Sequence, residues 1–160
     1  MSLNDDISAL QRVSLFEDFA DDQLRLLAFG AEDRDLSAGS VLYEQGDRAD
    51  SAYVVVSGAL ELFGPNDEPI GRAGPGTLIG ELALMVDTER TNRAVVNERT
   101  RVILIRRSLF RRILQEFPDL ARRVQQDFTA RLQETARGLA RVQDRLDALD
   151  AEAESLFFRD

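Results

Sequence analysis

The sequence contains no cysteine and no histidine, and all of its 20 basic residues are arginine. Without cysteine the chain has no disulfide, no thiolate zinc site and no cysteine nucleophile. Without histidine it lacks the commonest general base and the commonest transition-metal ligand. We therefore expect neither an enzyme nor a metalloprotein, and no cofactor.

Long apolar runs and excess positive charge are also missing. No run approaches the roughly 20 apolar residues that cross a bilayer, and the acidic N-terminus does not look like a signal peptide, so we expect a cytoplasmic protein without a membrane partner. The formal charge of −9 argues against a nucleic-acid surface, and no DNA partner is expected. An anion bound by such a chain needs a local source of positive charge.

Short β-prone runs separated by turn residues fill the middle of the chain. Because no helical pattern lies between them, they indicate an antiparallel sandwich or barrel of the jelly-roll kind. Helical patterns precede them at residues 4–10 and after Asp21-Asp22, which reads as an N-cap, and these helices give an α+β fold. Ser57-Gly58 reads as a two-residue hairpin turn. The expected strands are residues 41–43, 53–56, 59–63, 77–79, 94–96 and 102–105.

The pattern becomes helical after Ile105. Ser108 is a candidate cap for one helix, and Pro118 starts another, since proline is tolerated in a first helical turn. Heptad spacing over residues 128–153 predicts a long dimerisation helix, although the helix could instead pack on its own β-domain. The sequence thus divides into a β-domain, residues 1–118, and a C-terminal helix with an acidic tail, residues 119–160.

Residues 79–93, IGELALMVDTERTNR, combine an apolar run with isolated charges. A helical turn beginning at Glu81 would offer backbone N–H groups to an anion, and Gly80 would let a ligand approach the backbone closely. Arg90 is able to form a forked pair with a phosphate. The residues alone leave the alternative that Arg90 is an exposed turn arginine and Glu81 a surface carboxylate.

IGELALMVDTER closely resembles the phosphate-binding cassette of the cyclic nucleotide-binding domain family. The spacing from Glu81 to Arg90 is similar to that in the regulatory subunits of cAMP-dependent protein kinase. Further similarities are at Leu15-Phe16, at Gly39 to Tyr43, and at Tyr53 to Val55. Residues 110, 117–119 and 130–133 resemble the C-terminal helices of bacterial regulators of the catabolite-activator type.

The resemblance implies a binding site for a cyclic nucleotide, cAMP first and cGMP as the alternative. Arg90 would hold the exocyclic phosphate oxygens and Glu81 the ribose 2′-hydroxyl. Residues from three places complete the site that the resemblance implies: Gly80, Leu82 and Ala83 at the phosphate, Thr91 at phosphate or guanine, and Thr135 at adenine.

Two positions depart from the family pattern. Asn92 stands where the family usually has a small alanine, and Arg93 where it has threonine or serine. Arg93 either points to solvent or brings a second positive charge to the pocket.

We therefore expect a cyclic nucleotide sensor that forms a homodimer and relays binding through its C-terminal helix to an unknown protein partner. The alternatives are a nucleotide-free dimeric scaffold of the same fold and a truncated transcriptional regulator.

Overall fold

The computed structural model describes residues 3–131. The chain divides into two compact units, Met1–Ala121 and Arg122–Asp160. Residues 118–131 are helical, as the proline at position 118 predicts. Thr135 and most of the predicted dimer helix lie outside the described residues, so the domain division and the dimer stay predictions. No helix within residues 3–131 is long and apolar enough to span a membrane.

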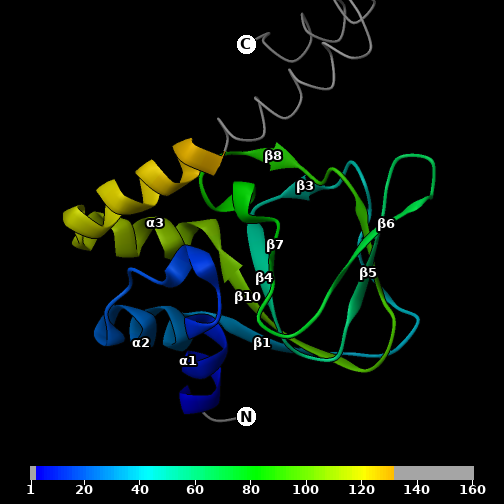
Figure 1. Cartoon of the computed structure of the whole chain (residues 1–160), viewed down its shortest axis with the longest axis horizontal. Helices are drawn as coiled ribbons and strands as arrows, with labels where there is room; N and C mark the ends of the chain where they lie inside the picture. Colours follow the sequence, from blue (N-terminus) through cyan, green and yellow to red (C-terminus); the bar gives the residue numbers. More distant parts are fainter. Residues whose placement is uncertain (1–2, 132–160) are drawn as a thin grey trace, which may run out of the picture. The chain divides into compact units, whose positions relative to one another are not determined.

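Residues 3–117 form three α-helices, two short 3₁₀ helices and ten strands (Figure 1). The helices are α1 (Leu3–Gln11), η1 (Ser14–Phe16), α2 (Asp21–Gly30), η2 (Glu81–Leu84) and α3 (Arg107–Glu116). The strands are β1 (Glu32–Leu36), β2 (Val41–Tyr43), β3 (Arg48–Ala49), β4 (Ser51–Ser57), β5 (Leu60–Phe63), β6 (Pro69–Ala73), β7 (Leu78–Ile79), β8 (Thr88–Glu89), β9 (Arg93–Val96) and β10 (Thr100–Arg106).

The strands form two four-stranded antiparallel sheets and one small ribbon. The sheet orders are β1-β10-β4-β7 and β2-β9-β5-β6, and β3 pairs with β8 in the ribbon. The eight strands of the two larger sheets confirm the predicted α+β jelly-roll fold. The ribbon and the strands β1 and β6 are additional to the strands predicted from sequence.

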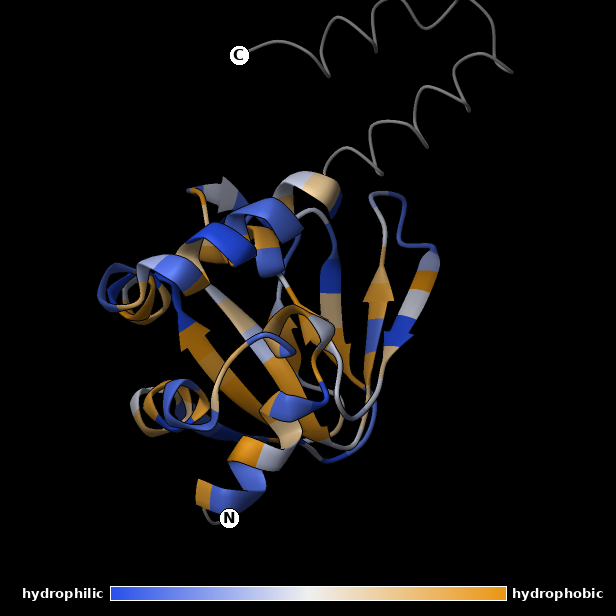
Figure 2. Ribbon diagram, turned by 60° about the vertical axis from the view of Figure 1, so that its left-hand side comes forward, coloured by the Kyte–Doolittle hydropathy of each residue, from blue (hydrophilic) through white to orange (hydrophobic). Residues whose placement is uncertain are grey.

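The main core lies between the two sheets. Tyr53, Val55 and Leu104 come from one sheet, and Tyr43 and Leu60 from the other. Strand β4 is buried along nearly its whole length, because the helices cover the second face of its sheet. This burial of both faces explains why its sequence is a continuous apolar run rather than an alternating one. Figure 2 shows the apolar residues gathered on these central strands.

A second cluster joins the helices. The ring centroids of Phe16 and Phe19 are 5.1 Å apart, and Phe19 lies 6.2 Å from Phe110 of α3. These three rings hold the N-terminal helices against α3, which itself follows β10 directly. The helix therefore has a fixed position beside the sheet that carries β7 and the adjoining η2.

Three local predictions were wrong. Ser57-Gly58 does not turn a hairpin, because β4 and β5 belong to different sheets, and this glycine carries the chain from one to the other. Its φ is +86°, and a Cβ atom there would lie 2.7 Å from the Cα atom of Thr100. Helix α3 is preceded by Arg106 as its cap residue, so Ser108 lies inside the helix. Asp21 begins α2 after Ala20, instead of acting as the cap itself.

Candidate functional site

The segment after β7 forms the turn predicted from sequence. Ile79 is the last strand residue, Gly80 adopts φ +77°, and Glu81 begins the four-residue helix η2. The N–H of Ala83 donates to the carbonyl of Gly80 at 3.1 Å. Ala83 and Leu84 are buried, so the turn is anchored to the core by its far end.

Arg90 lies directly after the ribbon strand β8, and its backbone is fixed by two hydrogen bonds. Its N–H donates to the carbonyl of Asp47 at 2.8 Å, and its carbonyl accepts from the N–H of Gly46 at 2.9 Å. The turn between β2 and β3 therefore determines where the Arg90 side chain starts. Gly46 and Asp47 precede Arg90 by more than forty positions in the sequence, so no local sequence pattern encodes this contact.

Arg90 is only 8% exposed. Its Cζ atom lies 4.6 Å from the ring centroid of Tyr43 and 5.5 Å from that of Tyr53. Its Nη2 atom donates to the hydroxyl of Ser51 at 3.4 Å. Arg90 is therefore an enclosed cation, and the alternative that it is an exposed turn arginine is ruled out for this structure.

The second terminal nitrogen of Arg90, Nη1, is buried and has no hydrogen-bond partner. A buried donor left unpaired costs about 1–3 kcal/mol, and more when the group is charged. Nη1 lies beside Gly80, so close that a Cβ atom on residue 80 would overlap it. The site thus presents a charged, unsatisfied donor next to the bare backbone of the turn.

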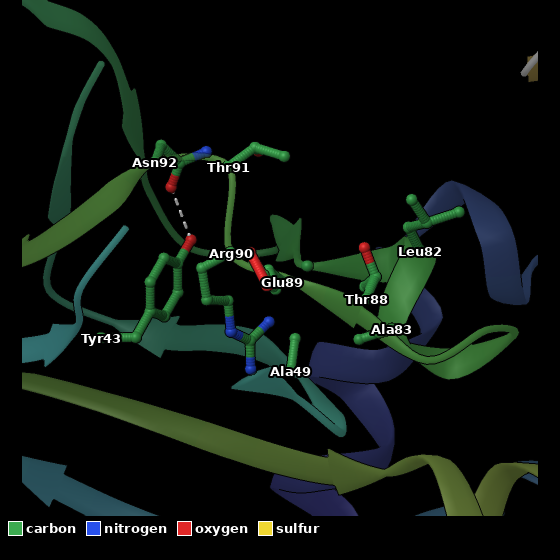
Figure 3. Close-up of a pocket in the computed structure, with 10 residues that line it drawn as sticks. Tyr43, Ala49, Leu82, Ala83, Thr88, Glu89, Arg90, Thr91 and Asn92 are labelled. Carbon is green, nitrogen blue, oxygen red and sulfur yellow. Dashed lines mark hydrogen bonds between the residues drawn. The ribbon is translucent and has the colours of Figure 1, made fainter. Parts of the chain in front are cut away.

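Arg90 and Gly80 also line a pocket with a volume of about 110 Å³. Its wall is built by β2, the β3–β8 ribbon, the η2 turn and the segment leading into β9 (Figure 3). The lining residues are Tyr43, Ala49, Gly80, Leu82, Ala83, Thr88, Glu89, Arg90, Thr91 and Asn92. This volume is below the roughly 300 Å³ at which small-molecule pockets usually begin.

Of the seven residues predicted from sequence, five line this one pocket: Gly80, Leu82, Ala83, Arg90 and Thr91. Glu81 is half-buried at the start of η2 and is not one of the lining residues. Thr135 lies outside the described residues. The assignment of a ligand contact to each of the seven stays a prediction.

Two residues that sequence reasoning left unexplained have defined partners. Asn92 accepts a hydrogen bond at its Oδ1 atom from the hydroxyl of Tyr43, at 2.8 Å. Arg93 forms an ion pair with Asp67, and its Cζ atom lies 5.0 Å from the ring centroid of Phe63. Of the two alternatives for Arg93, a second cation in the pocket is therefore wrong, since its charge is paired at the β5–β6 hairpin.

Sequence reasoning missed Tyr43, Tyr53 and Ser51, which surround Arg90. Tyr43 ends β2, and Ser51 and Tyr53 belong to β4, but nothing in their local pattern indicates contact with residue 90. Burial raises the pKa of the Tyr43 phenol, and the neighbouring Tyr53 acts in the same direction, whereas the positive charge of Arg90 opposes the rise.

Helix α3 is tied to the far end of the η2 turn by two arginines. Arg107 donates to the carbonyl of Val86 at 2.6 Å and to that of Ala83 at 3.4 Å. Arg111, one turn later, donates to the carbonyl of Met85 at 2.9 Å. These hydrogen bonds join residues 83–86 to α3.

Comparisons with known proteins agree with this arrangement. The profile of the family described as cyclic nucleotide-binding domain matches residues 33–117. A cAMP-dependent protein kinase regulatory subunit from Eremothecium gossypii is 34% identical over 107 residues, which is 67% of this chain and 23% of that protein. The chain thus spans about a quarter of that relative.

Two solved structures share the fold. A cyclic nucleotide-binding-like protein from Brucella abortus has 48% identity and a TM-score of 0.63, over 69% of this chain and 98% of the other. The catabolite activator protein of Thermus thermophilus has 26% identity and a TM-score of 0.68, over 80% of this chain and 62% of the other. From the matched profile and the shared fold, the chain belongs to the cyclic nucleotide-binding domain family.

Proposed function

We propose that this chain is a sensor that binds a cyclic nucleotide, cAMP in the first place and cGMP as the alternative. The single observation that carries the proposal is the unpartnered Nη1 atom of Arg90, which is buried beside Gly80 at a pocket. A phosphate oxygen is the partner that such a donor prefers, because the hydrogen bond is charge-assisted on both sides. The preference for cAMP follows the cAMP-dependent relative.

The remaining contacts are those that the family resemblance implies. Arg90 would bind the exocyclic oxygens of the cyclic phosphate, with the backbone of Gly80, Leu82 and Ala83 beside it. Glu81 would accept a hydrogen bond from the ribose 2′-hydroxyl after its side chain turns toward the pocket. Thr91, which is exposed at the pocket rim, would face the phosphate or the base. Thr135 is proposed as the adenine contact from the C-terminal helix.

A regulatory role without catalysis fits the chemistry of the site. The sequence offers no histidine and no cysteine as a general base or nucleophile. Binding would instead displace the η2 turn, and Arg107 and Arg111 would carry that displacement to α3. A ligand shifts such an equilibrium only by its difference in affinity for the two arrangements. A homodimer through residues 128–153 and a protein partner in the cytoplasm would complete the relay.

Thermal unfolding tests the proposal. A ligand at about 100 times its dissociation constant stabilises the folded state by about 2.7 kcal/mol. For a chain of this size we expect the Tm to rise by roughly 5–10 °C with cAMP or cGMP. Linear 5′-AMP is the control and should give a much smaller shift. If neither cyclic nucleotide raises the Tm at millimolar concentration, the chain is not a cyclic nucleotide sensor.

A further inference from the structure

The chain has two tyrosines and no tryptophan, and both tyrosines lie against Arg90. The two rings are stacked, with centroids 6.2 Å apart and an angle of 26° between their planes. Both residues are less than a tenth exposed. A cation beside aromatic rings is attracted to them more strongly in a desolvated site than in water, so the rings strongly influence where the guanidinium lies.

Tyr43 is itself held in place. Its hydroxyl donates the 2.8 Å hydrogen bond to Oδ1 of Asn92, which reaches the ring from the segment before β9 (Figure 3). The register of the sheet brings these residues together, since Tyr43 pairs with Ala94 across β2 and β9. The ring is therefore fixed at its backbone by the sheet and at its tip by the asparagine.

The atoms of the Arg90 guanidinium differ in their contacts with the protein. The tyrosine rings attract the cation through their π electrons and leave its N–H donors free. Ser51 accepts from Nη2. Nη1 is buried without a hydrogen-bond partner, and it is adjacent to Gly80. A rotation of the guanidinium would replace this arrangement by one in which Nη1 no longer lies beside the turn.

We propose that Tyr43 and Asn92 are positioning residues for Arg90: Asn92 fixes the Tyr43 ring, and the ring fixes the guanidinium so that Nη1 is presented to an anion at Gly80. This inference rests on the proposed function for the identity of the anion. It also gives a physical role to Asn92, the position at which this chain departs from the alanine usual in its family. A purely structural role for the hydrogen bond, in which it only joins β2 to the next segment, is the competing explanation.

The test uses Tyr43→Phe, Asn92→Ala and the double variant in the full chain. Loss of one hydrogen bond in a positioning role should weaken cAMP binding by about 3- to 10-fold in calorimetry. Either single change already removes the hydrogen bond. The double variant should therefore bind cAMP with about the same affinity as the single variant that binds it more weakly. Asn97→Ala, which truncates an exposed asparagine outside the pocket, is the matched control and should bind like the wild type.

The proposal would be overturned if both single variants bound cAMP as tightly as the wild type. It would also be overturned if the fold-loss of affinity in the double variant equalled the product of the two single losses. A fall in Tm with unchanged affinity would assign the bond to stability alone.

A second measurement needs no nucleotide. The side-chain NMR signal of Arg90 can be identified by its loss in Arg90→Ala. In the wild-type protein the two tyrosine rings should move the chemical shift of this signal away from that of an unrestrained arginine. Tyr43→Phe and Asn92→Ala should both move it toward the position of an unrestrained arginine, whereas Asn97→Ala should not. An unmoved signal refutes the positioning role. Moved signals without any nucleotide binding by the wild type would instead retain the positioning role and refute the proposed function.

Discussion

Nη1 of Arg90 occupies the space that a side chain on Gly80 would need. The two residues are neighbours because the η2 turn and the β3–β8 ribbon meet at one pocket. Gly80 therefore has two functions: it adopts φ +77°, which L residues rarely do, and it leaves room for the guanidinium.

A comparison of Gly80→Ala with Gly39→Ala separates these two functions. The new methyl group should displace the Arg90 guanidinium, so we expect cAMP affinity to fall by at least 10-fold in calorimetry. Gly39→Ala is a matched control, because Gly39 has φ +87° but nothing within 4 Å of the added Cβ atom. Both variants should lose roughly 1 kcal/mol of stability to backbone strain, and only the first should lose affinity. Equal affinities would show that the close approach to Arg90 is irrelevant to binding.

Arg93→Ala should leave nucleotide affinity unchanged, because the charge of Arg93 is engaged with Asp67 and Phe63 and does not reach the pocket. Its Asp67 partner is largely exposed, so the loss in unfolding free energy should stay within about 1 kcal/mol. Chemical denaturation and calorimetry on the same preparation measure both quantities. A large loss of affinity would return Arg93 to the site.

The fold could be predicted from sequence where apolar residues alternate or run together. The buried strands β4 and β10 and the short β2 were found in this way. Strand β1 was missed because its sequence, Glu-Asp-Arg-Asp-Leu, is almost entirely charged. It is held at the sheet edge by backbone pairing with β10 and by charge pairs such as Arg106 with Glu32, at 2.8 Å. Such an edge strand has no hydrophobic period to detect.

The site was predictable only in part, for a related reason. Gly80 and Arg90 belong to one contiguous motif, which a family resemblance identifies. Tyr43, Ser51 and Tyr53 reach Arg90 only through the pairing of distant strands. Their identity as a tyrosine, a serine and a tyrosine carries no signal of that contact, since each is also an ordinary strand residue.

The link between the η2 turn and α3 predicts a change in local protection. Arg107→Ala and Arg111→Ala remove side chains that donate to carbonyls of residues 83–86, so amide hydrogen exchange in this segment should become faster. cAMP should also protect α3 less in these variants than in the wild type. Arg112→Ala, an exposed arginine on the same helix, is the control. If amide hydrogen exchange in residues 81–87 is as slow in both variants as in the wild type, the link between the turn and α3 is refuted.

A buried carboxyl in α1 predicts a pH dependence of stability. Burial, and then the neighbouring carboxyl of Asp33, raise the pKa of Asp6 from 3.8 to about 6, while Arg101 opposes the rise. Because the folded-state pKa is the higher one, the stabilising contribution of the protonated group is complete below pH 3.8 and is lost as the pH rises through about 6.

Asp6→Asn replaces this carboxyl by a neutral group at every pH. At pH 7–8 the variant should therefore be more stable than the wild type, by roughly 1–3 kcal/mol, and the difference should vanish near pH 4. Urea unfolding at several pH values measures it. The exposed Asp5→Asn on the same helix should give no such trend. A difference that grows as the pH falls would contradict the assignment.

The most direct test of the central claim is a calorimetric titration of cAMP and cGMP into wild type, Arg90→Ala and Arg72→Ala. Arg72 is an exposed arginine paired with Glu98 away from the pocket, so it controls for the loss of one positive charge. We predict that the wild type and Arg72→Ala bind equally, and that Arg90→Ala weakens binding by about 2–5 kcal/mol with its fold intact. Equal binding by all three proteins would show that Arg90 does not hold the phosphate.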